Sequence, residues 1–303
     1  MNVTRRPIPP AASRQTAADS LRAAMFAIAL GLAASLSWGI ADFLGGIQSR
    51  RMPVVAVVLG SQLAGLVLVV AIVAARGKGI PSGDLVLYAA LSSVGGIVGL
   101  TAFYRALSIG AMGVVAPLSS TAAVIPLVVG IATGDRPSAL QGAGVAVAIV
   151  GVLLASREAS EHGEAGVSKG AGLALISAVG FGCFFLAIDK ASDSDVLWAV
   201  CVNRTVSVFL LGLAVLVTRP KLGLRPADMR TLAIVGTLDI LANGFFALAA
   251  TKGLVSVVSV LSSLYPVMTV ILARYILKER LRGIQRIGAA LALAGAALIS
   301  AGG

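Results

Sequence analysis

Long apolar runs fill this chain and constrain its fold more than any other feature. A helix needs about 20 mostly apolar residues to cross the hydrocarbon core of a bilayer. Ten runs of about this length follow one another, separated by short polar or helix-breaking stretches. They occupy residues 24–45, 54–75, 85–107, 113–133, 139–156, 170–189, 196–218, 230–250, 254–277 and 284–301.

These runs are continuous rather than alternating, which favours helices over strands. We therefore predict an all-α polytopic membrane protein with ten transmembrane helices. The composition agrees, because charged residues make up 12% of the chain, against about 25% in a typical soluble domain. Residues 1–23 are polar and contain several prolines, so we expect a disordered tail. This tail lacks the apolar core and cleavage site of a signal peptide.

The net charge of +11 indicates membrane contacts rather than nucleic acid. Lys and Arg occur in short clusters between apolar runs, and no basic face with interleaved aromatic residues is present. Such clusters cap membrane helices and contact lipid headgroups. With only Cys183, Cys201 and His162 available, the sequence predicts no disulfide framework, no zinc site and no cofactor.

The second half of the chain repeats the first, at a shift of 143 residues. The matching residues are Phe103, Ala106 and Gly110 with Phe246, Ala249 and Gly253, and then, one residue later, Asp135-Arg136 with Glu279-Arg280. We predict one five-helix repeat over 24–156 and a second over 169–301. Because five is odd, the second repeat starts on the opposite side of the membrane. The repeats are then inverted, an arrangement that places a substrate site near the midplane between them.

Several motifs in this order resemble the EamA-type transporters of the drug/metabolite transporter superfamily. The first run carries Trp38-Gly39, with Phe43 four residues later, similar to the family's Trp-Gly-x-x-x-Phe. The third ends in Phe103-Tyr104-Arg105-Ala106-Leu107, like the family's Phe-x-x-Ala-Leu. Gly134-Asp135-Arg136 is a variant of its Gly-Glu-Arg turn, and Lys278-Glu279-Arg280 stands at the matching place in the second half. The resemblance covers about residues 25–301.

The resemblance implies ten helices, both termini in the cytoplasm, and transport of small metabolites, often outward. We expect a multi-pass protein of the bacterial inner membrane that moves amino acids or related compounds. The Lys and Arg distribution gives conflicting indications of orientation. In the first half most of these residues lie on the side of the N-terminus, whereas in the second half most lie on the opposite side. We choose cytoplasmic termini, because the first helix often dominates orientation.

Ionisable residues inside the apolar runs are the first candidates for a functional site, because charge at membrane depth is costly. Arg204 and Asp239 lie on consecutive, antiparallel runs and differ in depth by about one turn, so we predict that they pair or share a substrate. Asn243 stands four residues after Asp239 and faces the same way. Asp42 lies in the first run, and Gln62 places an amide inside the second.

Three roles remain open for the Arg204–Asp239 pair. It could be a buried ion pair that only fixes helix packing, it could contact the substrate, or Asp239 or Asp42 could couple transport to protons. For Asp42, a simple position near the membrane interface is a further alternative.

Aromatic side chains provide candidate walls for a substrate, and each could equally be a packing or interfacial residue. Trp38 and Tyr265 rank first, with Tyr104 also a candidate. Prolines inside the fourth and ninth runs free a backbone carbonyl and permit bending, so Pro117, Pro126 and Pro266 are candidate gating residues, with a static kink as the alternative. The remaining aromatic candidates are Phe43, Phe181 and Phe184.

The sequence favours a secondary transporter that works by alternating access. No phosphate-binding loop for ATP is present, and no nucleophile or metal constellation indicates an enzyme. The alternative is a non-transporting membrane scaffold or a lipid-flippase subunit. The expected partners are a small-molecule substrate and membrane lipids, with proton coupling an open question. The fifth and tenth runs carry almost no polar residues, so we place them at the periphery, as scaffold or as a dimer face. The oligomeric state is either a monomer or a homodimer.

Overall fold

The computed structural model describes residues 11–81, 83–134, 138–157, 165–252, 261, 264–280 and 283–302, and the described residues are helical with short connections and no strands. The all-α prediction is therefore confirmed for them. Six of the described helices are long and apolar enough to cross a membrane. Their spans are Met25–Ser49, Val54–Arg76, Leu85–Ile109, Gly170–Ser192, Val196–Thr218 and Pro226–Ala249.

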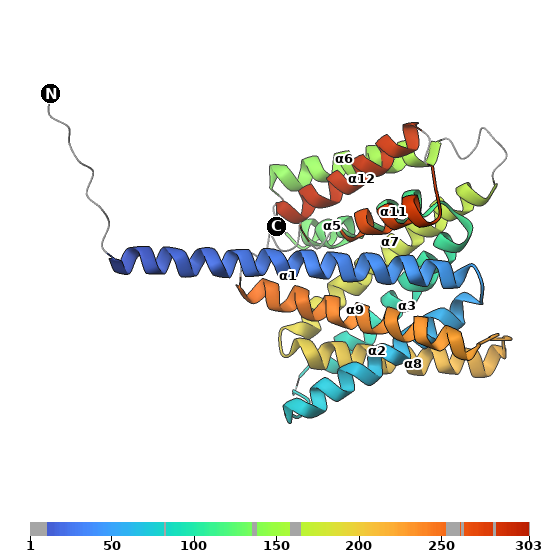
Figure 1. Cartoon of the computed structure of the whole chain (residues 1–303), viewed down its shortest axis with the longest axis horizontal. Helices are drawn as coiled ribbons and strands as arrows, with labels where there is room; N and C mark the ends of the chain where they lie inside the picture. The colour runs from blue at the N-terminus through green and yellow to red at the C-terminus, as the bar shows by residue number, and fades with distance from the viewer. Residues whose placement is uncertain are drawn as a thin grey trace.

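The order of the elements follows the predicted runs (Figure 1). The helices are α1 (Ala11–Ser49), α2 (Val54–Arg76), α3 (Leu85–Ile109), α4 (Met112–Ser119), the 3₁₀ turn η1 (Ser120–Ala123), α5 (Val124–Ala132), α6 (Ala139–Arg157), α7 (Ala165–Ser192), α8 (Val196–Thr218), α9 (Pro226–Lys252), α11 (Tyr265–Ile276) and α12 (Gly283–Ala301).

Local sequence explains where several of these helices begin and end. Pro53 precedes α2, where its missing N–H costs no helical hydrogen bond. Gly77 ends α2 in the left-handed region, at φ 62°, which glycine adopts without strain. Asp195 caps α8, because its carboxylate accepts hydrogen bonds from the backbone N–H groups of Leu197 and Trp198.

The first helix begins earlier than the sequence predicts. We expected a disordered tail over 1–23, yet α1 starts at Ala11, so the prediction is wrong from that residue onward. Alanine is frequent between Ala11 and the first apolar run, and alanine has the highest helix propensity. A helix that is already nucleated extends at little cost, which explains the longer element. Its N-terminal part projects beyond the other helices (Figure 1).

The fourth predicted run is not one continuous helix. It forms α4, η1 and α5, with Pro117 inside α4 and Pro126 inside α5. Proline cannot donate a backbone hydrogen bond and displaces the preceding turn. At the break the hydroxyl of Ser120 donates to the carbonyl of Pro117, at 2.8 Å, and that of Thr121 donates to the carbonyl of Leu118, at 2.7 Å. Side chains thus supply part of the hydrogen bonding that the break removes.

The ninth run also differs from the prediction. Its described part is α11, and Pro266 stands in the first turn of this helix rather than in its middle. Most of the preceding segment, including residues 253–260, lies outside the described residues. Pro266 therefore begins a helix, a position that suits its fixed φ angle.

Glycines allow the helices of the two halves to approach closely. A Cβ atom on Gly180 of α7 would lie 2.7 Å from the Cα atom of Gly99 and 3.0 Å from the carbonyl oxygen of Gly95, both on α3. A Cβ atom on Gly144 of α6 would lie 2.9 Å from the carbonyl oxygen of Gly295 on α12. Among the described helices, the α3–α7 and α6–α12 contacts are the most extensive. Small residues at these positions bring backbones together in lipid.

The helix pairing stays nearly the same when the two halves are exchanged. The first helix of each half packs on the third helix of the other, as α1 does on α9 and α7 on α3. The second helices, α2 and α8, pack on each other, and so do the last helices, α6 and α12. The pair α6–α12 runs along one edge of the helical body in Figure 1, which agrees with the predicted peripheral position.

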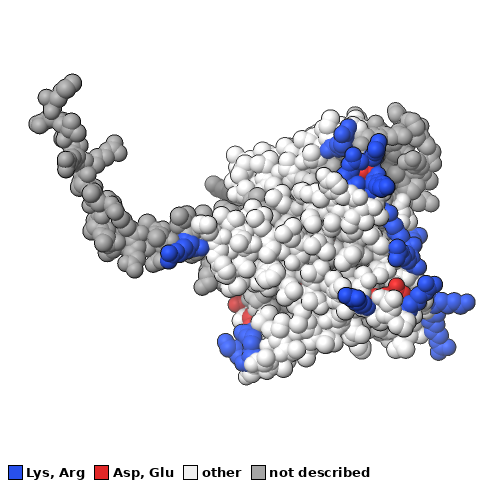
Figure 2. Space-filling model, viewed as in Figure 1, with Lys and Arg blue, Asp and Glu red and all other residues white. Residues whose placement is uncertain are grey.

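The two ends of the helices pack differently. At one end, which we call the α1–α2 end, a continuous buried core joins helices of both halves and includes Phe103 and Met112. At the other, the α2–α3 end, separate small clusters form around Val69, Leu85 and Ala27. Lys and Arg side chains gather at the α1–α2 end, at the right of Figure 2. The described connecting residues at the α1–α2 end are 50–53, 110–111, 219–225 and 277–280, and those at the α2–α3 end are 77–81, 83–84, 133–134, 138 and 193–195.

Candidate functional site

A cavity of about 140 Å³ lies between helices of both halves and contains most of the polar residues selected from the sequence. Seven of the eight candidate binding residues line it, and Tyr104 is the exception. The lining residues come from α1, α2, α3, α7, α8, α9 and α11. They are Trp38, Asp42, Val58, Gln62, Gly96, Ile97, Leu100, Phe181, Phe184, Phe185, Asn203, Arg204, Ser207, Asp239, Asn243 and Tyr265.

An ion pair on Arg204 is the main polar feature of this cavity. The guanidinium of Arg204 donates to a carboxylate oxygen of Asp239 and to the amide oxygen of Gln62. The predicted Arg204–Asp239 pairing is therefore confirmed. The side chain of Arg204 is 11% exposed and that of Asp239 is 31% exposed, so the carboxylate faces the cavity more openly. One guanidinium thus joins α2, α8 and α9.

Two further polar groups belong to residues that line the cavity. The Nε–H group of Arg204 is buried and has no hydrogen-bond partner among the described residues. Asp42 places a second carboxylate on the cavity wall, from α1. Two carboxylates and one guanidinium line the cavity, so its ionised form carries a net negative charge. An unpartnered buried donor is costly, and a ligand acceptor would remove that cost.

Asn203 is a residue whose contribution the sequence does not reveal. Its amide nitrogen donates to the hydroxyl of Ser92, at 2.7 Å, and the hydroxyl of Ser93 donates to the Asn203 carbonyl, at 2.9 Å. These bonds hold α8 against α3 and thereby position the neighbouring Arg204. Ser207 lies four residues after Asn203 and also lines the cavity, so helical spacing from Asn203 would have indicated it. Gly96 and Phe185, by contrast, carry no sequence signal.

Asn243 lies where the helical spacing predicts, next to Asp239 on the cavity wall. Its side-chain amide donates to the Asp239 carbonyl, one turn earlier on α9, at 2.7 Å. This bond fixes the Asn243 side chain and leaves the Asp239 carboxylate for Arg204.

Aromatic rings form the apolar wall. The ring of Trp38 on α1 lies 6.3 Å from that of Tyr265 on α11 and 6.2 Å from that of Phe246 on α9, measured between centroids. On the α7 side, the rings of Phe184 and Phe185 lie 5.3 Å apart. Rings at these distances and tilts make favourable edge contacts, and their faces attract cations.

The remaining candidates lie outside the cavity lining. Tyr104 is 2% exposed, and its ring packs on that of Phe103 and against the backbone of Gly45. Phe43 is likewise buried in the continuous core of the α1–α2 end. The prolines Pro117, Pro126 and Pro266 belong to the helix break and to the start of α11, and none of them lines the cavity.

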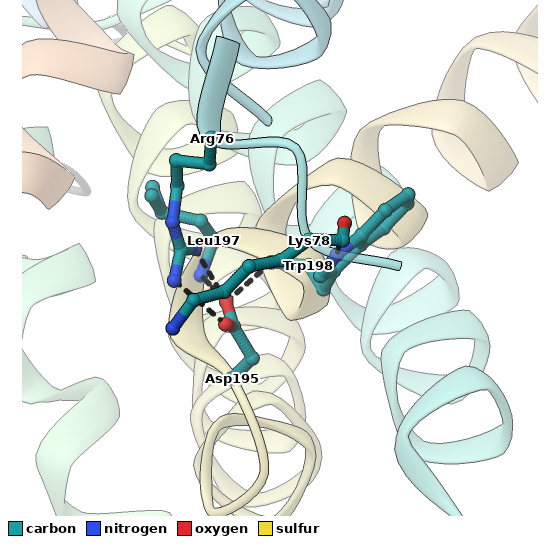
Figure 3. A network of polar contacts seen from close by, with 5 residues as sticks. All are labelled: Arg76, Lys78, Asp195, Leu197 and Trp198. Carbon is teal, nitrogen blue, oxygen red and sulfur yellow. Dashed lines mark hydrogen bonds and ion pairs between the residues drawn. The ribbon is translucent and has the colours of Figure 1, made fainter. Parts of the chain in front are cut away.

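A polar network at the α2–α3 end connects the two halves beyond the cavity (Figure 3). Arg76, at the end of α2, makes two hydrogen bonds of 3.0 Å to the carboxylate of Asp195. The indole N–H of Trp198 donates to the carbonyl of Lys78 at 3.1 Å. The hydrogen bond from Arg76, with the N–H groups of Leu197 and Trp198, holds the pKa of Asp195 below its usual range.

A second polar contact connects the two halves at the α1–α2 end. Both carboxylate oxygens of Glu279 accept backbone N–H groups at the start of α4, from Met112 and Gly113, at 3.0 Å each. Arg50 pairs with the same carboxylate at 3.6 Å and donates to the carbonyl of Leu107 at 3.2 Å. This contact, which we call the Glu279 clamp, holds α1, α3 and α4 to the turn before α12.

Comparison with known proteins gives one family and one fold. The model of the EamA-like transporter family matches residues 25–157 and again residues 168–301. No curated protein matches the chain. A solved structure described as "Crystal structure of protein" superposes with a TM-score of 0.61 at 19% identity, over 90% of this chain and 96% of the other. At this identity the likeness shows the fold alone.

Proposed function

The chain belongs to the EamA-like transporter family, and on this premise we propose that it is a secondary transporter that moves small metabolites across the bacterial inner membrane by alternating access. The single observation that carries the proposal is the ion pair of Arg204 and Asp239 inside a cavity bounded by helices of both halves. Charged side chains at membrane depth in family transporters mark a substrate or ion pathway by default.

The proposed architecture has ten spans in two inverted repeats, over 24–156 and 169–301. The reciprocal pairing of helices between the halves supports it, because a two-fold axis between inverted repeats would relate the α1–α9 contact to the α7–α3 contact. A substrate site between the repeats near the midplane is the usual consequence of such inversion. The break between α4 and α5 and the start of α11 would then bend, with Pro117, Pro126 and Pro266 as gating residues.

We infer that the substrate is an amino acid or a related amino compound with an apolar side chain. Its ammonium group would lie by Asp42, and its carboxylate would take the Nε–H group of Arg204, which has no partner among the described residues. The rings of Trp38 and Tyr265 would cover its apolar part. A carboxylate on a guanidinium forms a charge-assisted hydrogen bond, about twice as strong as a neutral one.

We propose that, in the conformation of this structure, the cavity opens toward the α2–α3 end. The continuous core and the Glu279 clamp support that choice, since both lie at the α1–α2 end. At the α2–α3 end the described buried residues form small, separate clusters instead of one continuous core. Alternating access would require the core at the α1–α2 end to separate while these clusters merge.

We also propose that both termini face the cytoplasm. The bias of Lys and Arg in the first half supports this orientation, and the bias of the second half opposes it. Reporter fusions at the C-terminus, active on only one side of the membrane, test the orientation. A reporter active in the periplasm would reverse the orientation and leave the transport proposal unaffected.

Transport in proteoliposomes tests the proposed function. We expect uptake of radiolabelled amino acids with apolar side chains, measured with and without a pH gradient. A response to the gradient would assign proton coupling, with Asp42 or Asp239 as the candidate residue. Absence of flux for every metabolite class tested, from folded protein, would overturn the transporter assignment and favour a scaffold or a lipid-flippase subunit.

The substitution Asp239→Asn tests the site. It should lower the transport rate about tenfold or more, because a hydrogen bond to a charged group contributes about 1.5–3 kcal/mol. The thermal unfolding temperature should change much less, since the amide oxygen still accepts from Arg204 in a partly exposed position. Asp228→Asn, in the first turn of α9, is the matched control on the same helix and should transport normally. Parallel losses of folded protein and of transport would support a pair that only fixes packing.

A further inference from the structure

A second cavity, of about 350 Å³, lies at the α1–α2 end and shares no lining residue with the central cavity. It is bounded by α4, α11, the turn that follows α11, and α12. Three of its six lining residues are arginines. The lining consists of Gly113, Val270, Arg274, Glu279, Arg280 and Arg286.

The charges of this cavity are not balanced by the residues that line it. Three guanidinium groups face one carboxylate, and Glu279 already uses both oxygens to accept the N–H groups of Met112 and Gly113. Arg274 donates to the Glu279 carbonyl at 3.3 Å. Within the described ranges, Arg280 and Arg286 form no ion pair. Guanidinium groups gathered without partners favour an anion, and they match the geometry of phosphate in particular.

Exposed apolar side chains adjoin the basic cavity. On α11, Ile271 is 43% exposed and Tyr275 is 79% exposed, and each directly follows a residue that lines the cavity, Val270 or Arg274. On α12, Ile287 directly follows Arg286 and is 57% exposed. In a membrane protein, such side chains at the end of a helix face lipid chains and the headgroup region. A basic cavity beside an apolar surface suits a ligand that has a phosphate and hydrocarbon chains.

We propose that this cavity binds the phosphate headgroup of an anionic phospholipid, whose acyl chains lie along the exposed apolar residues of α11 and α12. Basic pockets between membrane helices bind such headgroups. The phosphate is held by Arg280 and Arg286, with Arg274 beside them. Because Glu279 belongs both to this cavity and to the Glu279 clamp, the bound lipid stabilises the closed α1–α2 end.

Thermal unfolding of the purified full-length protein in a neutral detergent tests the proposal. Added phosphatidylglycerol should raise the unfolding temperature by several degrees, whereas phosphatidylcholine at the same concentration should not. Inorganic phosphate at that concentration should give a smaller shift, because it lacks the chains. Arg280→Gln and Arg286→Gln should each remove most of the phosphatidylglycerol effect. Arg51→Gln, an exposed residue at the same end but outside the cavity, is the matched control and should retain it.

The following outcomes would contradict the proposal. Equal shifts from both lipids, or a full shift in both cavity variants, would overturn the site. A shift from inorganic phosphate equal to that from phosphatidylglycerol would replace the lipid with a soluble anion. Native mass spectrometry provides a second readout in case a variant is unstable. Wild-type protein should retain more phosphatidylglycerol than Arg280→Gln, and equal retention counts against the site.

Discussion

Asp195 performs two structural roles with one carboxylate, since it caps α8 and pairs with Arg76 at the end of α2. The ion pair requires the ionised form, whereas capping requires only an acceptor oxygen. The hydrogen bond from Arg76 is the main reason that its pKa is lowered in the folded protein. A group with a lowered folded-state pKa contributes stability above its unfolded-state pKa, which is about 3.9 for aspartate. That contribution disappears as the pH falls through the lower, folded-state value.

Asp195→Asn should therefore lower the unfolding temperature at neutral pH by a few degrees and flatten its decline on acidification. Asparagine can still cap a helix, so most of the loss reflects the pair with Arg76. Unfolding monitored in detergent from about pH 7 to about pH 3 provides the measurement, with the unfolded-state aspartate pKa near 3.9 inside that range. Asp193→Asn, in the same connection, is the control. Identical pH profiles for wild type and Asp195→Asn would contradict the assigned role.

Sequence reasoning located most of the cavity residues because charge inside an apolar run is rare and helical spacing fixes direction. Arg204, Asp239 and Asn243 were found in this way. The sequence predicts Tyr104 as a binding residue, whereas the structure places it in the buried core. An aromatic residue in an apolar run gives the same signal in either position. Phe185 and Gly96 could be placed in the cavity lining only once the packing of α3 against α7 was known.

At the scale of helices, glycines allow the backbones of α3 and α7 to pack closely. The substitution Gly180→Ala would place a methyl group 2.7 Å from the Cα atom of Gly99, so α3 and α7 must move apart. Overpacking of this kind costs about 1–3 kcal/mol. Thermal unfolding in detergent should show the loss.

Gly172 offers a matched control on the same helix. Nothing lies within 4 Å of a Cβ atom placed there, so Gly172→Ala should be neutral or should stabilise α7 by about 0.5–1 kcal/mol. If both variants unfold at the wild-type temperature, α3 and α7 are further apart than these distances indicate.

Element boundaries were predictable where polar or helix-breaking residues mark them, as at both ends of α2 and at the start of α8. Two features could not be read from hydropathy. The segment from Ala11 is helical because of alanine propensity rather than apolar character. The break between α4 and α5 lies within an apolar run, and hydropathy alone does not distinguish a static kink from a 3₁₀ segment.

At the scale of the molecule, the Glu279 clamp should favour the state that is closed at the α1–α2 end. Glu279→Gln removes the charge that pairs with Arg50 and weakens the bonds to the start of α4. A cysteine replacing the buried Leu107, in a background without Cys183 and Cys201, should then react about fivefold faster with a water-soluble maleimide. A change of about 1 kcal/mol alters a population by this factor.

Asp228→Asn serves as control for the clamp, because Asp228 lies at the same end and, among the described residues, its carboxylate accepts a hydrogen bond from the backbone N–H of Arg225, at 3.1 Å, and none from the clamp. In the Asp228→Asn variant, the cysteine that replaces Leu107 should react with the maleimide at the same rate as in the parent. Equal rates in Glu279→Gln and the parent would mean that the continuous core alone keeps this end closed.

The bonds of Arg204 have a kinetic consequence. Its guanidinium joins Gln62 from the first half to Asp239 from the second. In the proposed function the same group also binds the substrate. A ligand that takes only the Nε–H group leaves these bonds intact, whereas one that also takes a terminal N–H group competes with Gln62 or Asp239. Recognition and release of the halves would then draw on the same free energy. The compound that is transported fastest is then not the one that binds with the highest affinity. A compound that holds Arg204 too strongly should stall the cycle and act as an inhibitor, and the fastest substrates should bind only moderately well.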